Sequence, residues 1–263
     1  MRITVIGGTG LIGARLVRAL RAGGHEVWAA SRATGVNSYT GEGLEEALSG
    51  AEVVVDVSNS SYTDEAAASE FFYGSTTNLL GYGAAAGVGH HVALSVVGTD
   101  RLARAEGGYF VAKQQQERLI AASGLPYSVV HATQFFEFIR SITDHAMRGG
   151  VARVAEVQVQ PMAADDVADA VARIAVGEPL FGMAEFAGPE VFGLDEIAVM
   201  DLRSRRDDRD VVPDPLGTYF GARLGRGDLL PGSMASIAPT RYREWRIRRP
   251  AAVTAGPAGL SSL

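Results

Sequence analysis

The sequence predicts an α/β protein built on a doubly wound parallel sheet. Short apolar segments alternate along the chain with amphipathic segments of 10–20 residues, which is the order of strands and helices that such a sheet requires. One apolar segment, residues 52–57, has three consecutive valines at its centre, as expected of a strand covered by helices on both faces. The first apolar segment also runs directly into a glycine-rich loop.

The N-terminal elements are the best defined. A predicted strand, Arg2 to Ile6, is followed at once by the loop Gly7-Gly8-Thr9-Gly10-Leu11-Ile12-Gly13. The next segment places Leu16, Val17 and Leu20 on one helical face and arginines largely on the other, and this pattern predicts an amphipathic helix. Gly23-Gly24 ends that helix.

The later elements continue the alternation. Further strands are predicted over residues 27–30, 52–57, 92–97 and 127–131. Further helices are predicted over residues 66–86, 109–123 and 167–176. We expect residues 1–160 to form the main domain and residues 161–249 to form a small C-terminal lobe interleaved with the same core. Residues 250–263, rich in Ala, Gly, Ser and Pro, are expected to be a disordered tail.

Composition excludes several classes of function. The formal net charge of −6 over 263 residues argues against a general nucleic-acid binder, which would be basic. Without cysteine there are no disulfides, thiol nucleophiles or thiolate metal ligands, and the five histidines are scattered, so no metal site is predicted. No apolar run reaches the roughly 18 residues of a membrane span, and because the sequence runs directly into the first strand we expect no signal peptide. We expect a soluble, cytoplasmic protein.

The glycine loop predicts a dinucleotide site of the Rossmann type. Glycines at positions 7, 10 and 13 follow a strand and open a helix, which is the context in which this spacing carries a mechanism. Missing side chains let the backbone approach a pyrophosphate, and the helix N-terminus offers unpaired N–H groups. A tight strand–helix turn without a ligand is the alternative.

The residues after the second strand indicate which dinucleotide binds. A site selective for NAD usually has an acidic residue there, accepting a hydrogen bond from the ribose 2′-hydroxyl. No Asp or Glu occurs between Val27 and Thr40, and the strand ends in Ser31-Arg32. A guanidinium at this place can pair with a 2′-phosphate. We therefore expect NADP(H), with NAD(H) as the alternative.

Lysine occurs once in the chain, at Lys113, four residues after Tyr109; the other 23 basic residues are arginines. Residues four apart on a helix share a face. An ammonium beside a phenol favours the phenolate, so we expect the pKa of Tyr109 to be lowered toward neutrality, which suits proton transfer. An accidental pair on a solvated helix is the competing interpretation.

With these residues the chain resembles the atypical short-chain dehydrogenases/reductases, specifically the NmrA-like NAD(P)H-binding group. Three further segments carry the resemblance, which covers about residues 1–200: residues 91–98, 131–138 and 160–168. The group contains both enzymes and proteins that only sense the cofactor.

The resemblance implies roles for particular residues. Tyr109 would donate a proton, while Lys113 would hydrogen-bond the nicotinamide ribose. The pyrophosphate would be held by Gly7, Thr9, Gly10, Leu11, Ile12 and Gly13. Val57, Ser58 and Asn59 would line the adenosine side. His131 and Thr133 would lie near the nicotinamide, and the substrate would meet His131, Gln134 and Phe135.

Relatives of this kind normally present a serine before the tyrosine helix, where it polarises the substrate carbonyl. Ser95 or Thr99 would serve here, although Ser95 fits a cofactor contact or a strand cap equally well. We expect an NADPH-dependent oxidoreductase that reduces a carbonyl or quinone-like small molecule. A silent NADP(H)-binding sensor, and an epimerase or dehydratase using the same site, are the alternatives. The sequence does not predict the oligomeric state.

Overall fold

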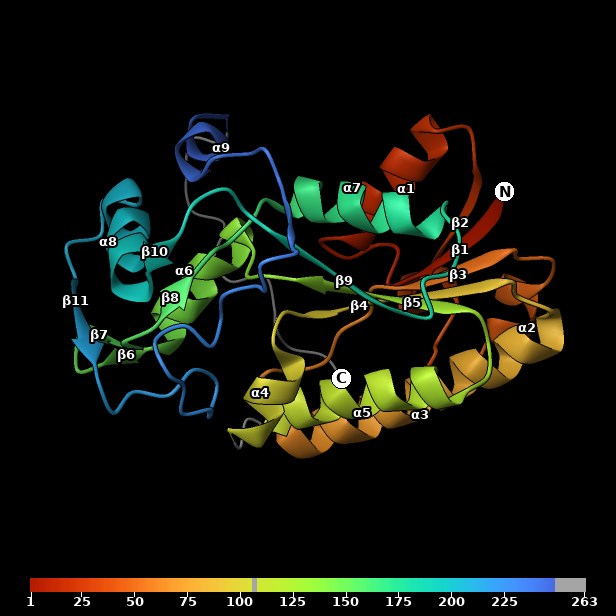
Figure 1. Cartoon of the computed structure of the whole chain (residues 1–263), viewed down its shortest axis with the longest axis horizontal. Coiled ribbons are helices and arrows are strands. Elements are labelled where there is room, and N and C mark those ends of the chain that lie inside the picture. The colour runs from red at the N-terminus through yellow and green to blue at the C-terminus, as the bar shows by residue number, and fades with distance from the viewer. Residues whose placement is uncertain (106–107, 249–263) are drawn as a thin grey trace.

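A computed structural model describes residues 1–105 and 108–248 of the chain. Its centre is a seven-stranded sheet in which every pair of neighbouring strands is parallel, in the order β2-β1-β3-β4-β5-β9-β12 (Figure 1). The strands are β1 (Arg2–Ile6), β2 (Glu26–Ala30), β3 (Val53–Asp56), β4 (His90–Val96), β5 (Tyr127–Ala132), β9 (Gly182–Ala187) and β12 (Ser236–Ile237). The predicted fold class, a Rossmann-type doubly wound sheet, is confirmed.

Helices cover both faces of the sheet, which explains why the central strands are apolar throughout. On one face α1 (Gly13–Ala22) packs against α7 (Ala164–Ala175), and on the other α3 (Glu65–Ala86) packs against α5 (Gly108–Ala122) (Figure 1). Two short helices, α2 (Leu44–Leu48) and α4 (Thr99–Arg104), pack against α3 and α5 respectively. Within the described residues, no helix is long and apolar enough to cross a membrane.

A smaller lobe lies beyond the carboxyl ends of the strands (Figure 1). Its helices are α6 (Phe136–His145), α8 (Leu194–Ser204) and α9 (Tyr242–Arg248). Its strands are β6 (Met147–Arg148), β7 (Val151–Ala155), β8 (Gln158–Val159), β10 (Phe192–Gly193) and β11 (Asp210–Asp214). The predicted tail, residues 250–263, lies outside the described residues. Because β9, β12 and α7 belong to the main sheet layer, the chain passes repeatedly between sheet and lobe.

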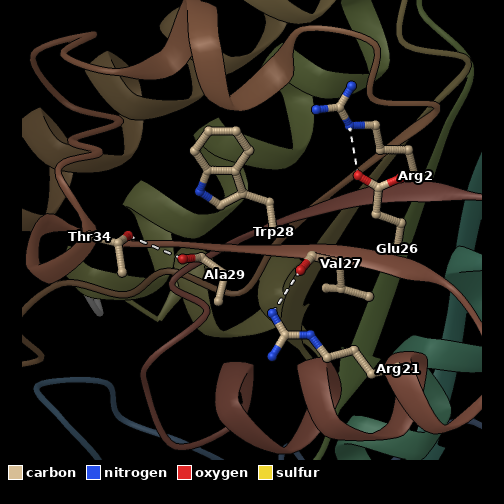
Figure 2. Close-up of a pocket in the computed structure, with 7 residues that line it drawn as sticks. All are labelled: Arg2, Arg21, Glu26, Val27, Trp28, Ala29 and Thr34. Carbon is tan, nitrogen blue, oxygen red and sulfur yellow. Dashed lines mark hydrogen bonds and ion pairs between the residues drawn. The ribbon is translucent and has the colours of Figure 1, made fainter.

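In the described part of the chain β2 is an edge strand, and its exposed side is capped by side chains (Figure 2). Arg21 Nη2 donates to the Val27 carbonyl at 2.8 Å, and Thr34 Oγ1 donates to the Ala29 carbonyl at 3.1 Å. These bonds occupy acceptors that another strand would need. A groove of about 450 Å³ runs along this edge, over Trp28, but none of the predicted site residues lines it.

Candidate functional site

The glycine loop has the shape of a phosphate cradle. The Gly7 and Gly8 N–H groups donate to the Ala30 carbonyl at 2.9 and 3.1 Å, which ties the loop to the end of β2. A Cβ on Gly13 would lie 2.1 Å from the Gly7 carbonyl oxygen, so only glycine lets α1 begin so close to the loop. A Cβ on Gly10 would meet nothing nearer than 3.3 Å, and Gly10 is exposed. The loop therefore leaves backbone open to a ligand at the start of α1, as a pyrophosphate site requires.

Ser31 and Arg32 lie beside this cradle because they directly follow Ala30, which bonds to the loop. Arg32 begins a short 3₁₀ helix, Arg32–Thr34, and is exposed. The Ser31 N–H donates to Thr34 Oγ1 at 2.9 Å and holds the turn. The residue that was expected to select NADP(H), Arg32, thus follows the end of β2 that bonds to the loop.

The loop after β3 closes the other side of the crevice. A Cβ on Gly7, whose φ is +78°, would lie 2.9 Å from the Ser58 nitrogen, so the two loops are in direct contact. Asp56, at the end of β3, is buried; it accepts hydrogen bonds from the Ser58 N–H at 2.9 Å and from Gln116 Nε2 at 3.0 Å. β1 lies between β2 and β3, where the strand order reverses. Ligands of open α/β sheets bind at this point.

Helix α5 directs Tyr109 and Lys113 toward this crevice, and both side chains are buried. The Tyr109 hydroxyl donates to Asn59 Oδ1 at 2.7 Å, so it reaches the loop that packs on Gly7. Lys113 Nζ donates to the Leu94 carbonyl at 2.8 Å and to Gln116 Oε1. Gln116, in turn, bonds to Asp56. Each member of the tyrosine–lysine pair is therefore connected to residues 56–59 through a side chain.

The predicted lowering of the Tyr109 pKa is wrong. Burial, together with the neighbouring Tyr62 phenol, raises the pKa of Tyr109 well above its ordinary value. The Lys113 ammonium lies 4.5 Å from the centre of the Phe72 ring and donates to Leu94. Burial lowers the pKa of Lys113 to about 8, although Asp56 and Glu117 oppose the change. Desolvation is therefore the largest influence on the pKa of the phenol.

Ser95 lies at the end of β4, directly opposite His131 on β5. The Ser95 hydroxyl donates to Glu117 Oε1, and His131 Nε2 lies 3.1 Å from the same oxygen. Burial would raise the pKa of Glu117, but the bonds from His131 and Ser95 hold it below its ordinary value. The Ser95 proton is thus already engaged. Sequence reasoning missed Glu117, although its place four residues after Lys113 puts it on the same helical face.

An aromatic cage covers the Tyr109 phenol. The Tyr62 ring centre lies 4.4 Å from that of Tyr109, 4.8 Å from Phe138 and 5.4 Å from Phe220. The Tyr62 hydroxyl accepts from Asn59 Nδ2 at 2.8 Å. The sequence shows no signal for Tyr62 or Phe220, because both lie in irregular segments far from Tyr109 along the chain.

The other predicted site residues are divided between the cage and the sheet. Thr133 Oγ1 donates to the Gln160 carbonyl at 2.7 Å, and Phe135 packs in the core beneath α7 and pairs with Met162. Gln134 is buried beside the cage. Phe138, rather than Phe135, lies against Tyr62. Among the residues that the structure describes, no three His, Asp or Glu side chains group as metal ligands would.

Comparison with protein families finds one match, which covers the N-terminal part of the chain. Residues 3–105 match the model of the NAD dependent epimerase/dehydratase family. No sequence among the curated proteins matches.

Many solved structures share the fold. A nucleoside-diphosphate-sugar epimerase from Staphylococcus aureus is 16% identical, with a TM-score of 0.68, over 93% of this chain and 99% of its own. An NADPH-dependent quinone oxidoreductase from Escherichia coli is 18% identical, with a TM-score of 0.64, over 94% and 98%. A dTDP-glucose 4,6-dehydratase from Streptomyces venezuelae is 19% identical, with a TM-score of 0.69, over 95% and 98%. At such identities the likeness concerns the fold alone.

Proposed function

We propose that this chain is an NADPH-dependent oxidoreductase of the short-chain dehydrogenase/reductase type, reducing a carbonyl or quinone-like small molecule. The observation that carries the proposal is the bond from the Tyr109 hydroxyl to Asn59, in the loop that packs on Gly7. This bond supports the proposal because it holds the Tyr109 hydroxyl within one side chain of the glycine crevice. The sequence resemblance to the NmrA-like group supports the same assignment.

The cofactor proposal rests on the fit of the crevice. The exposed loop at Gly10 and the N-terminus of α1 suit a pyrophosphate, while the exposed Arg32 suits a 2′-phosphate. Nicotinamide cofactors occur among proteins of this fold, since one neighbour is described in complex with NADPH and another with NAD. When bound, the cofactor would supply the hydride, and the protein would supply orientation and a proton.

The electrostatics favour the reductive direction. A phenol whose pKa is raised by burial stays protonated at neutral pH, so Tyr109 acts as an acid toward an oxygen that gains negative charge. An ammonium has three N–H donors. Lys113 donates two of its N–H bonds to Leu94 and Gln116, and the third would be available to a ribose hydroxyl. The Lys113 charge would also stabilise the phenolate that remains after proton transfer.

Two other functions use the same groups. An epimerase or dehydratase is favoured by the family match over residues 3–105. A sensor of the NADP(H) state is favoured by Tyr62, which packs against the Tyr109 phenol, a residue that is only 3% exposed. A sensor would bind the cofactor without consuming it.

NADPH consumption with a panel of quinones and ketones tests the proposal, with Tyr109→Phe as the variant. Tyr73→Phe, an exposed tyrosine on α3, is the matched control. We expect Tyr109→Phe to lose roughly 100-fold or more in kcat with unchanged NADPH affinity, and the control to behave as wild type. Equal turnover in Tyr109→Phe would remove the mechanism. Tight NADPH binding without turnover of any acceptor would favour the sensor.

A further inference from the structure

The side chain of Gln134 is buried without the partners that a buried amide needs. The residue is 7% exposed, and neither Nε2 nor Oε1 has a hydrogen-bond partner of ordinary geometry among the described residues. Its backbone is held firmly, since the Met162 N–H donates to the Gln134 carbonyl at 2.9 Å. Unsatisfied buried polar groups destabilise a fold and are rare in native structures. The position therefore carries a stability cost that folding alone does not explain.

The amide lies among the polar groups of the aromatic cage. Burial and the Tyr62 phenol raise the pKa of Tyr219, and a polar contact from the Gln134 amide to the Tyr219 phenol lowers it, so Tyr219 is a polar neighbour of that amide. Tyr219 in turn contributes to the raised pKa of Tyr109. The Tyr219 ring stacks on Phe110, next to Tyr109 in α5, with centres 6.3 Å apart. Three phenols and one amide, from four separate segments, thus lie close together.

The expected carbonyl-polarising group is not available in this arrangement. Ser95 already donates its only proton to Glu117. Gln134 Nε2 has two N–H donors; it makes no hydrogen bond of ordinary geometry, and its contact with the Tyr219 phenol engages at most one of them. A carbonyl oxygen is an acceptor and would satisfy that amide on binding. The surrounding rings of Tyr62, Phe138 and Phe220 favour a flat aromatic body on the same molecule.

We propose that Gln134 is the substrate-binding donor of this site and that it selects aromatic carbonyl compounds. Gln134 Nε2 would donate to the carbonyl oxygen and polarise it. The carbonyl carbon gains a hydride from NADPH, the C=O π bond becomes the new O–H bond with the Tyr109 proton, and NADP⁺ and a phenolate remain. Solvent then reprotonates the phenolate, and Gln134 keeps its protons. This inference rests on the proposed function.

Binding of matched probes tests the role of Gln134. The probes are 1,4-naphthoquinone and naphthalene, which lacks the oxygens, titrated calorimetrically into protein with NADP⁺ present. The absence of cysteine removes thiol addition to the quinone. We expect wild type to prefer the quinone by roughly tenfold, the value of one hydrogen bond to a buried donor. Gln134→Leu should bind both probes alike, while Gln115→Leu on α5 keeps the wild-type preference.

Thermal stability separates this role from a structural one. Gln134→Leu removes two unsatisfied atoms, so its melting temperature should equal or exceed that of wild type. An amide that stabilises the fold would give a lower value. A Gln134→Leu variant that keeps the quinone preference, or melts well below wild type, overturns the inference, as does a wild type that binds neither probe. A further outcome separates the two proposals. If Gln134→Leu loses the preference for the quinone but wild type turns over no acceptor, the inference stands and the proposed function is refuted.

Discussion

The buried ammonium of Lys113 predicts an unusual dependence of stability on pH. The fall of its pKa from 10.5 to about 8 corresponds to roughly 3 kcal/mol of unfavourable free energy for the charged form in the folded protein. Between these values the unfolded chain binds more protons than the folded one, so stability rises with pH. The cost is fully present below pH 8 and fades as pH approaches 10.5.

The perturbation is Lys113→Met, which keeps an unbranched side chain one atom shorter and removes its charge. Wild type should gain roughly 2 to 3 kcal/mol in unfolding free energy relative to the variant between pH 7 and pH 10. The difference at a single pH is less informative, because the variant also loses the bonds to Leu94 and Gln116. The way in which the difference in unfolding free energy between wild type and variant varies with pH depends only on the proton that Lys113 binds.

Urea unfolding of both proteins across this pH range measures the effect, with Lys113→Arg as a control that stays charged throughout. Because the chain has a single lysine, protein labelled with ¹³C-lysine gives one Cε resonance, and its titration reports the pKa directly. A midpoint near the ordinary 10.4 of lysine, or parallel stability curves for wild type and Lys113→Met, would refute the reasoning.

Four further substitutions test the crevice and the network around it. Arg32→Ala should weaken the binding of NADPH roughly tenfold or more and the binding of NADH little, because only NADPH carries the 2′-phosphate that a guanidinium binds. Equal losses of affinity for the two cofactors in fluorescence titrations would contradict the selectivity. Gly13→Ala should lower the melting temperature, since its Cβ would lie 2.1 Å from the Gly7 oxygen, whereas Gly10→Ala should fold normally and bind the cofactor more weakly. Glu117→Gln should be less stable than wild type at pH 7. This difference in stability should shrink as acid protonates Glu117, whose pKa is held below its ordinary value. A difference that stays constant down to pH 3 in acid unfolding would count against the role of the carboxylate.

The sequence predicted those parts of the site that depend on local spacing. The spacing of six residues between Gly7 and Gly13 brings the start of α1 against the loop, where a Cβ on Gly13 would clash. The glycine pattern therefore predicts this contact directly. Tyr109 and Lys113 share a helical face because four residues make about one turn. The first five strands of the main sheet were found because apolar runs are required wherever helices cover both faces, whereas β9 and β12 were not predicted. In the lobe, strands such as β8 have two residues, too few for any periodicity to be visible.

Contacts between distant segments decided the chemistry. Tyr62 and Phe220 contact Tyr109 and Phe138 only once the loops are folded. Glu117 accepts the hydrogen bond from Ser95 only because α5 packs against β4. The pKa of Tyr109 is raised, where the sequence predicted that it would be lowered, for the same reason. Spacing along a helix shows that a lysine is near, but desolvation depends on all the side chains that cover the phenol. The sequence by itself determined the fold class, the glycine cradle and the tyrosine–lysine pair, since each is a short-range pattern. Only the tertiary structure decided which protons are free and which groups are buried, because both are properties of the packed neighbourhood.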